Sequence, residues 1–169
     1  MSYPLQYFDN NFLTGMFKYN EHIKYNYANL SDLTEDGIYY IFASRCDKVL
    51  NDLIKQTYFW NYINDFRQNI LHISVIYQCE KLVKHLVENN LVDINSQDFL
   101  GRTPVYFAAA LNNFNIVKYL VENGAIINYS TTEGISPLQI AAINDKFDNL
   151  NYLVKMDPRN VSRITINQM

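Results

Sequence analysis

The sequence predicts an all-α solenoid of stacked helix–turn–helix units joined by short β-hairpin loops. The segment 101–109 returns one unit later as the segment 134–142. Residues 69–75 hold the same frame one unit earlier, with a slightly longer offset, and the second halves of the units match as well. A period of roughly 33 residues is typical of supersecondary units that bury their apolar faces only against their neighbours.

The first helix of the best-matched unit is expected at about residues 104–111. Thr103 is a suitable N-cap, and Pro104 follows at the first helical position, where its missing N–H does no harm. Ala108 and Ala109 belong to the apolar stripe of this helix, and their small size allows a neighbouring helix to approach closely. The corresponding helix of the next unit is expected at about 137–144.

The second helix of this unit is expected at about residues 115–123, because apolar residues recur there with helical spacing. Gly124 is placed to end it in a left-handed conformation. One unit later, the helix at about 147–155 is expected to stop before Pro158, which cannot continue it.

The repeat extends to a less regular unit upstream. The same shift aligns residues 38–54 with 71–87, so the predicted units run from about 31–63, 64–97, 98–130 and 131–163. Together they form a domain over 31–163. Residues 1–30 are expected to cap the exposed end of the first unit, and 164–169 to form a tail. Terminal units are expected to be atypical, because one face lacks a neighbouring repeat.

The stretches 101–109 and 116–128 resemble the ankyrin repeat, whose Thr-Pro-Leu-His-x-Ala signature and period of about 33 residues they follow. The resemblance covers three successive units at fixed offsets. It implies that each unit is a helix–turn–helix followed by a long loop that ends in a β-hairpin. It also implies that the protein binds a partner protein.

The sequence departs from the ankyrin pattern at several positions. The family's histidine, which links adjacent repeats by hydrogen bonds, is kept as His72 but is replaced by Tyr106 and Gln139 in the next two units. These two junctions must therefore be satisfied by other groups or be weaker. Arg67 stands where the hairpin glycine belongs, and Asn90 replaces the glycine that ends the second helix.

Composition favours one domain in a reducing compartment. The chain has 169 residues, of which 49% are hydrophobic, enough for a continuous core. A net charge of -3 without a basic block argues against a nucleic-acid partner. No segment is apolar enough to span a membrane. Cys46 and Cys79 occupy equivalent positions and are interpreted as small buried thiols rather than a disulfide, so the cytoplasm is expected, with the nucleus as an alternative.

No motif points to catalysis, so the protein is expected not to be an enzyme. It lacks a Gly-rich phosphate loop, a His-Glu-x-x-His motif and a Cys-x-x-Cys motif. His22, His72 and His85 do not have metal-ligand spacing. No cofactor, metal or small-molecule substrate is expected. An enzyme whose site is assembled across repeats is the least favoured class.

The resemblance implies that a partner binds the concave surface formed by the hairpin tips and first helices. Phe99 and Leu100 are the leading anchors, since two large apolar residues at a hairpin tip mark an interface unless they fold back onto Phe66. The binding positions that the resemblance implies are Asp65, Phe66, Gln68, Ile76 and Tyr77 in the second unit, Gln97, Phe99, Leu100, Arg102, Ala110 and Leu111 in the third, and Ser130, Thr132, Glu133, Ile135, Ile143 and Asn144 in the fourth.

Two functions remain as alternatives. The first is a protein-interaction module. In its more specific form, a small viral or pathogen protein binds a host signalling or ubiquitin-ligase protein in the host cytoplasm. The compact size and an AT-rich codon bias, with 14 Tyr and 10 Phe, favour this form. The alternative is a structural subunit anchored in a larger assembly through the aromatic residues 1–30.

Overall fold

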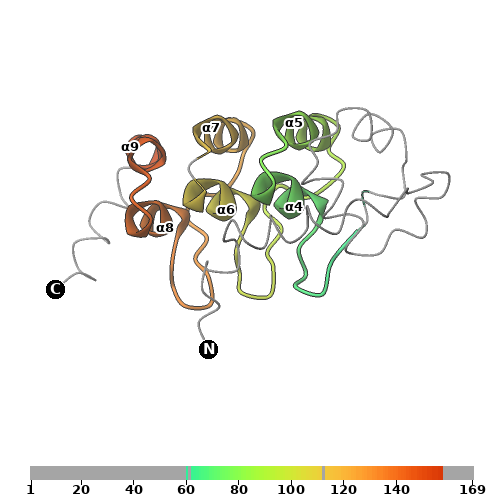
Figure 1. Ribbon diagram of the computed structural model, residues 1–169, viewed down its shortest axis with the longest axis horizontal. Helices are drawn as coiled ribbons and strands as arrows, with labels where there is room; N and C mark the ends of the chain where they lie inside the picture. The colour runs from blue at the N-terminus through green and yellow to red at the C-terminus, as the bar shows by residue number, and fades with distance from the viewer. Residues whose placement is uncertain (1–59, 61, 112, 158–169) are drawn as a thin grey trace, which may run out of the picture. The chain divides into compact units, whose positions relative to one another are not determined.

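The computed structural model describes Trp60, residues 62–111 and residues 113–157. These residues form three helix pairs, which are α4 (Ile70–Ile76) with α5 (Glu80–Glu88), α6 (Pro104–Ala110) with α7 (Phe114–Glu122), and α8 (Pro137–Ile143) with α9 (Phe147–Met156). The first helices of the pairs form one row and the second helices another, while the loops before the first helices project away from the second-helix row (Figure 1). The all-α solenoid is confirmed.

The bounds predicted for four of these helices, α6 to α9, agree with the structure to within one residue at each end. In the described part of the chain, the only extended pairing outside the helices is an isolated antiparallel bridge between Ile63 and Asn69, so the hairpin loops are mostly turns. The predicted segments 1–30 and 164–169 lie outside the described residues. So does the predicted unit 31–63, apart from its last few positions.

Side-chain caps begin the first helices. Asn69 accepts hydrogen bonds from the backbone N–H groups of Leu71 and His72, and Thr103 and Ser136 each accept one from the third residue of their helix. Proline occupies the first helical position of α6 and α8, where no intrahelical N–H bond is lost. Thr103 therefore acts as the predicted N-cap.

The second helices α5 and α7 end in left-handed residues. Gly124 has a φ of 94°, and the next N–H, of Ala125, donates to the carbonyl of Leu120 at 2.9 Å. In α5, Asn90 takes the glycine position with a φ of 50°, and Leu91 donates to Leu86 at 3.0 Å. Asparagine tolerates this backbone better than most residues, so the replacement leaves the helix end intact.

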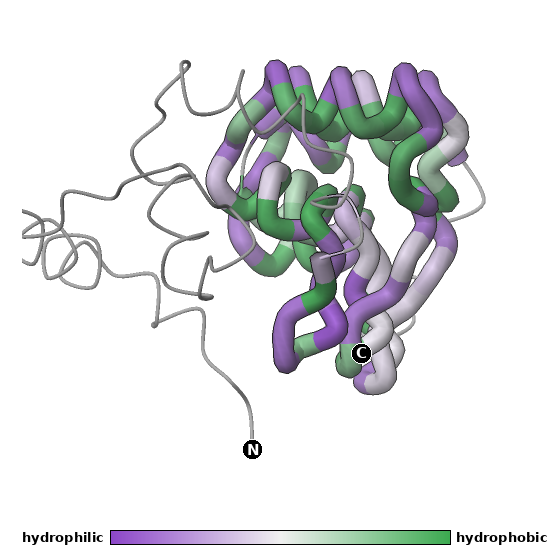
Figure 2. The backbone as a smooth tube through the Cα atoms, turned by 90° about the vertical axis from the view of Figure 1, so that its right-hand side faces the viewer, coloured by the Kyte–Doolittle hydropathy of each residue, from purple (hydrophilic) through white to green (hydrophobic). Residues whose placement is uncertain are grey.

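The core lies between the two helix rows and between neighbouring pairs. Apolar residues of the second helices lie on the side that faces the first helices (Figure 2). Leu82, Ile116 and Leu120 are essentially without solvent contact. Ala108 and Ala109 are likewise fully buried, and their helix α6 packs against both α4 and α8. The predicted close approach of the first helices therefore rests on these alanines.

The junction between the second and third units uses the family's histidine. His72 is fully buried, and its Nε2 lies 3.1 Å from the carbonyl oxygen of Arg102, 30 residues further along the chain. A carbonyl can only accept, so Nε2 carries the proton and Nδ1 accepts the backbone N–H of Asn69 at 3.3 Å. One side chain thus caps its own helix and joins two repeats.

Asparagines hold the next junction, where Tyr106 stands at the position of His72. Gln139, at the same position one unit later, caps its own helix by accepting the N–H of Ser136 at 2.8 Å. Asn149 of α9 is fully buried and donates to the carbonyls of Ala108 and Ala109, at 3.3 and 3.0 Å. Asn144 donates to Ala110 at 3.1 Å. Residues that the sequence did not single out for this purpose therefore link the two units, although Oδ1 of Asn149 is buried without a hydrogen-bond partner.

Acidification is expected to destabilise the fold through His72. Burial lowers the pKa of His72 below its usual 6.5, although the hydrogen bond to Arg102 opposes this shift. The unfolded chain therefore takes up a proton near pH 6.5, whereas the folded protein does so only at lower pH. The contribution of neutral His72 to the free energy of unfolding is fully present above about pH 6.5. It falls by up to about 1.4 kcal/mol per pH unit as the pH drops towards the folded-state pKa.

Denaturant titrations of the wild type and His72→Gln between about pH 7.5 and pH 5 measure this contribution. Glutamine is the matched replacement, because Gln139 fills the equivalent position with its cap intact. The free energy of unfolding should fall more steeply with acidification in the wild type than in the variant. Parallel profiles would contradict the assignment.

Candidate protein-binding surface

Three turns with the same backbone hydrogen-bond pattern precede the first helices α4, α6 and α8. They span Asn64–Gln68, Asp98–Arg102 and Thr131–Ile135, and in each the first residue's N–H donates to the last residue's carbonyl at 3.0 Å. In each turn, the side chain of the first residue also accepts hydrogen bonds from backbone N–H groups of the same turn. The Oδ1 atoms of Asn64 and Asp98 each accept two backbone N–H groups, whereas Oγ1 of Thr131 accepts one.

Backbone hydrogen bonds join the tips of the turns into a row. The N–H of Phe99 donates to the carbonyl of Phe66 at 3.0 Å, and the N–H of Thr132 donates to the carbonyl of Leu100 at 2.9 Å. Gly101 approaches the next turn so closely that a Cβ atom there would lie 3.3 Å from Cα of Thr131. The tips therefore present one connected surface, even though each belongs to a different repeat.

The carboxylate of Asp98 makes several interactions within this row of turns. Its carboxylate is buried, and Oδ2 accepts from Nε of Arg102 at 2.7 Å and from Nε2 of Gln68 at 3.3 Å. A second guanidinium nitrogen of Arg102 also lies 2.7 Å from Oδ2. The guanidinium stacks on the ring of Phe107, with Cζ 4.7 Å from the centroid. These bonds tie the first turn to the second and fix the second internally.

Two of the expected contact residues are therefore used inside the fold. Gln68 was expected on the binding surface, but it is only 7% exposed and bonds to Asn64 and Asp98. Arg102 was expected to offer its guanidinium to a partner, but that group is held in the Asp98 ion pair. The expectation that residues at these positions do not hold the fold together is wrong for Gln68 and Arg102, because both side chains bond to Asp98.

The remaining positions divide by exposure. Exposed residues are Asp65, Phe66, Gln97, Phe99, Leu100, Ser130, Thr132, Glu133 and Ile143. Half-buried residues are Ile76, Tyr77, Leu111, Ile135 and Asn144, whereas Ala110 is buried. Among the first-helix positions only Ile143 is exposed, whereas most of the turn positions are exposed.

Three exposed apolar side chains lie at the turn tips, whereas other exposed apolar residues of the described part of the chain, such as Ile143, Phe147 and Met156, lie on α8 and α9. Phe66 is 49% exposed, Phe99 59% and Leu100 36%. The alternative, in which Phe99 and Leu100 fold back against neighbouring turns, does not hold for Phe99, most of whose surface remains in solvent. Ile63 at the base of the first turn is 62% exposed and was missed by the sequence analysis. We call Asp65, Phe66, Phe99, Leu100, Thr132 and Glu133 the hairpin surface.

Arg67 is a second residue that the analysis of binding positions missed. It has a φ of 59°, where the equivalent Gly101 and Gly134 have 73° and 81°. Its guanidinium carbon lies 5.8 Å from the ring centroid of Phe99. Its place at a glycine position was visible in the sequence, but its approach to an aromatic ring of the next turn was not.

Replacing Arg67 with glycine is expected to stabilise the protein by about 1 kcal/mol. Glycine adopts the left-handed backbone without the Cβ clash that arginine incurs there, and the exposed cation–π interaction that the variant lacks is a weak one. Thermal unfolding should show a higher midpoint for Arg67→Gly than for the wild type. A lower midpoint would mean that the interaction with Phe99 outweighs the backbone strain.

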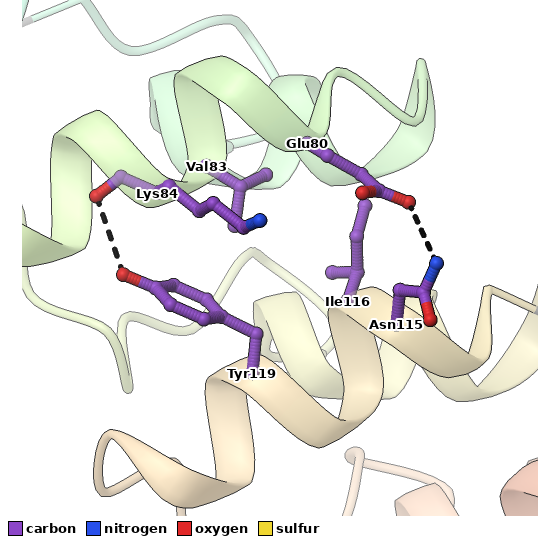
Figure 3. A pocket seen from close by; sticks show the side chains of 6 residues that line it. All are labelled: Glu80, Val83, Lys84, Asn115, Ile116 and Tyr119. Atoms are coloured by element: carbon purple, nitrogen blue, oxygen red, sulfur yellow. Dashed lines mark hydrogen bonds between the residues drawn. The ribbon is translucent and has the colours of Figure 1, made fainter.

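The rest of the described structure offers little for chemistry. A shallow depression between α5 and α7 is lined by Glu80, Val83, Lys84, Asn115, Ile116 and Tyr119 (Figure 3). Its polar groups bond to one another, Asn115 to Glu80 at 3.3 Å and Tyr119 to the carbonyl of Lys84 at 3.4 Å. Across the described residues, no three His, Cys, Asp or Glu side chains gather to hold a metal ion. None of the described helices is long and apolar enough to cross a membrane.

Stacked helix pairs with a linked row of turn tips define a helical-repeat protein. A family model of ankyrin repeats in three copies matches residues 38–130 and 71–164. The chain belongs to the ankyrin repeat family. Proteins of this family typically act as non-catalytic modules that mediate protein–protein interaction.

Several known proteins are similar over part of the chain. Alpha-latrocrustotoxin-Lt1a of Latrodectus tredecimguttatus is 34% identical over 38% of this chain and 5% of its own length. A putative ankyrin repeat protein of fowlpox virus is 29% identical over 47% of this chain and 12% of its own. The nuclear factor NF-kappa-B p105 subunit of Gallus gallus is 32% identical over 54% and 10%. The chain thus spans a small fraction of each of these relatives.

Proposed function

We propose that this protein binds a partner protein through the hairpin surface and the adjoining ends of the first helices. The observation that carries the proposal is the exposure of Phe66, Phe99 and Leu100 on a row of turns that is otherwise tightly bonded. Aromatic side chains are enriched in the cores of protein interfaces, and on a rigid frame such anchors lose little conformational entropy on binding.

The identity of the partner belongs to the same proposal. A viral or pathogen origin, with a host signalling or ubiquitin-ligase protein as the partner, is supported by the similarity to a fowlpox virus ankyrin repeat protein. A reducing compartment such as the cytoplasm is supported by the low cysteine content of the chain. The alternative function, a structural subunit anchored through residues 1–30, concerns a segment outside the described residues.

Replacing Phe99 and Leu100 together with serine is expected to weaken partner binding by roughly 2 kcal/mol or more. The fold should be almost unchanged, since both side chains are exposed. Affinity purification from the source cells with wild-type and variant baits identifies proteins that only the wild type retains. Calorimetric titration of the purified partner then gives the two affinities.

The control for this pair is Phe147→Ser, which removes a 65% exposed aromatic residue from α9. It should bind as the wild type does. Equal affinity of the double variant would exclude the hairpin surface and favour anchoring through residues 1–30. Loss of the cooperative melt would show instead that Phe99 and Leu100 support the fold.

A further inference from the structure

Arg67 is exposed, has a left-handed backbone conformation and forms no ion pair with any described residue. Within the described residues its side chain forms no ion pair or hydrogen bond, and its one interaction is with the ring of Phe99. Arg102, by contrast, is held in the ion pair with buried Asp98. A left-handed backbone at a non-glycine residue raises the free energy of the folded state, and such residues concentrate at functional sites.

The surroundings of Arg67 favour one kind of ligand group. The guanidinium lies 5.8 Å from the ring centroid of Phe99, which is 59% exposed, so a fork of N–H donors stands beside an open apolar surface. A guanidinium matches a carboxylate by two parallel hydrogen bonds, and a bound apolar neighbour strengthens the pairing by excluding water. Asp65, two residues away, forms no ion pair with Arg67 in the described structure.

Charge also differs between the two end turns of the row. The first described turn exposes Arg67 together with Asp65, whereas the third turn exposes Glu133 and has glycine at the position of Arg67. The apolar anchors Phe99 and Leu100 lie in the turn between them. A negative charge on an extended partner segment is therefore attracted to the guanidinium of Arg67, whereas the same charge placed near Glu133 would be repelled.

We propose that Arg67 and Phe99 form a recognition site for an acidic side chain of the partner, set beside an apolar side chain that packs on Phe99 and Leu100. This inference rests on the proposed function of the hairpin surface and adds the charge of the partner. It explains why an arginine remains where glycine would make a more stable turn. Arg67 thus lowers the stability of the free protein and raises the affinity for the partner.

Random twelve-residue peptides displayed on phage are the probe, panned on the full chain and counter-selected on the Phe99→Ser, Leu100→Ser variant. The selected peptides are expected to carry an acidic residue near an apolar one. Their affinity, measured by fluorescence anisotropy, should fall about tenfold or more for Arg67→Gly and for Arg67→Gln. The glycine variant should nevertheless melt at a higher temperature than the wild type. The affinity for the wild type should also weaken with added salt more than the affinity for the variants does.

Lys118→Gln is the matched control, since it removes one exposed positive charge from the second-helix row. It should leave peptide affinity unchanged. Peptides that require Phe99 and Leu100 but bind Arg67→Gly and Arg67→Gln as tightly as the wild type would overturn the acidic-group inference and leave the proposed function standing. If no selected peptide depends on Phe99 and Leu100, both ideas are overturned.

Discussion

Placing arginine at Ala109 or aspartate at Leu120 is expected to unfold the protein. Both side chains are fully buried, Ala109 in the helix that packs against α4 and α8, and Leu120 in the apolar face of α7. A charged group there has no partner and cannot reach water, and the added bulk at Ala109 pushes neighbouring helices apart. The cost should be several kcal/mol, a large share of the stability of a small domain.

The matched controls lie in the last described repeat, one at the position equivalent to Ala109 and the other at an exposed position of the second helix. Ala142→Arg makes the same change as Ala109→Arg at a half-buried site and should cost much less. Phe147→Asp puts the charge of Leu120→Asp on a 65% exposed residue in the first turn of a helix, where an acidic group is tolerated. Circular dichroism melts compare all four. Wild-type melting of Ala109→Arg or Leu120→Asp would mean that the repeat register is wrong.

Replacing Asp98 with alanine is expected to destabilise the protein by about 3 kcal/mol. The change deprives two backbone N–H groups of the second turn of their acceptor and leaves the guanidinium of Arg102 without its carboxylate. The partial exposure of Arg102 lets water compensate in part, which keeps the cost below that of a fully buried pair. Urea titration measures the loss, and unchanged stability would contradict the role of Asp98.

The preceding turn suggests the rescue. Asn64 and Gln68 occupy the positions of Asp98 and Arg102 and bond side chain to side chain at 3.0 Å, while Oδ1 of Asn64 accepts the same two backbone N–H groups. Asp98→Asn alone should be destabilising, because its amide faces the guanidinium. Adding Arg102→Gln should recover most of the stability. A double variant no more stable than Asp98→Asn would show that the turns are not interchangeable.

Much of the fold could be predicted because local signals and the repeat agree. Thr103 and Pro104 fix the start of α6, Gly124 fixes the end of α7, and the period carries these assignments to the neighbouring units. The tight packing of Ala108 and Ala109 follows from residue size alone. These features depend on residues a few positions apart or on one regular offset, so a single sequence suffices to read them.

The errors concern side chains whose partners lie one repeat away. Gln68 and Arg102 have the polarity of surface residues, and only the placement of Asp98 between them turns both inward. Asn149 occupies the position of Leu82 and Ile116, where the pattern requires an apolar residue, yet it bonds to carbonyls 40 and 41 residues away. Such contacts depend on how two units stack, and the repeat pattern does not specify them.

An NMR titration of the labelled protein with its purified partner tests binding through the hairpin surface most directly. Binding through the hairpin surface should place the largest changes in amide shift on Phe66, Phe99, Leu100, Thr132 and Glu133, while exposed second-helix residues such as Lys118 and Lys155 change little. Changes concentrated on α5, α7 and α9, with the turn tips unaffected, would contradict it.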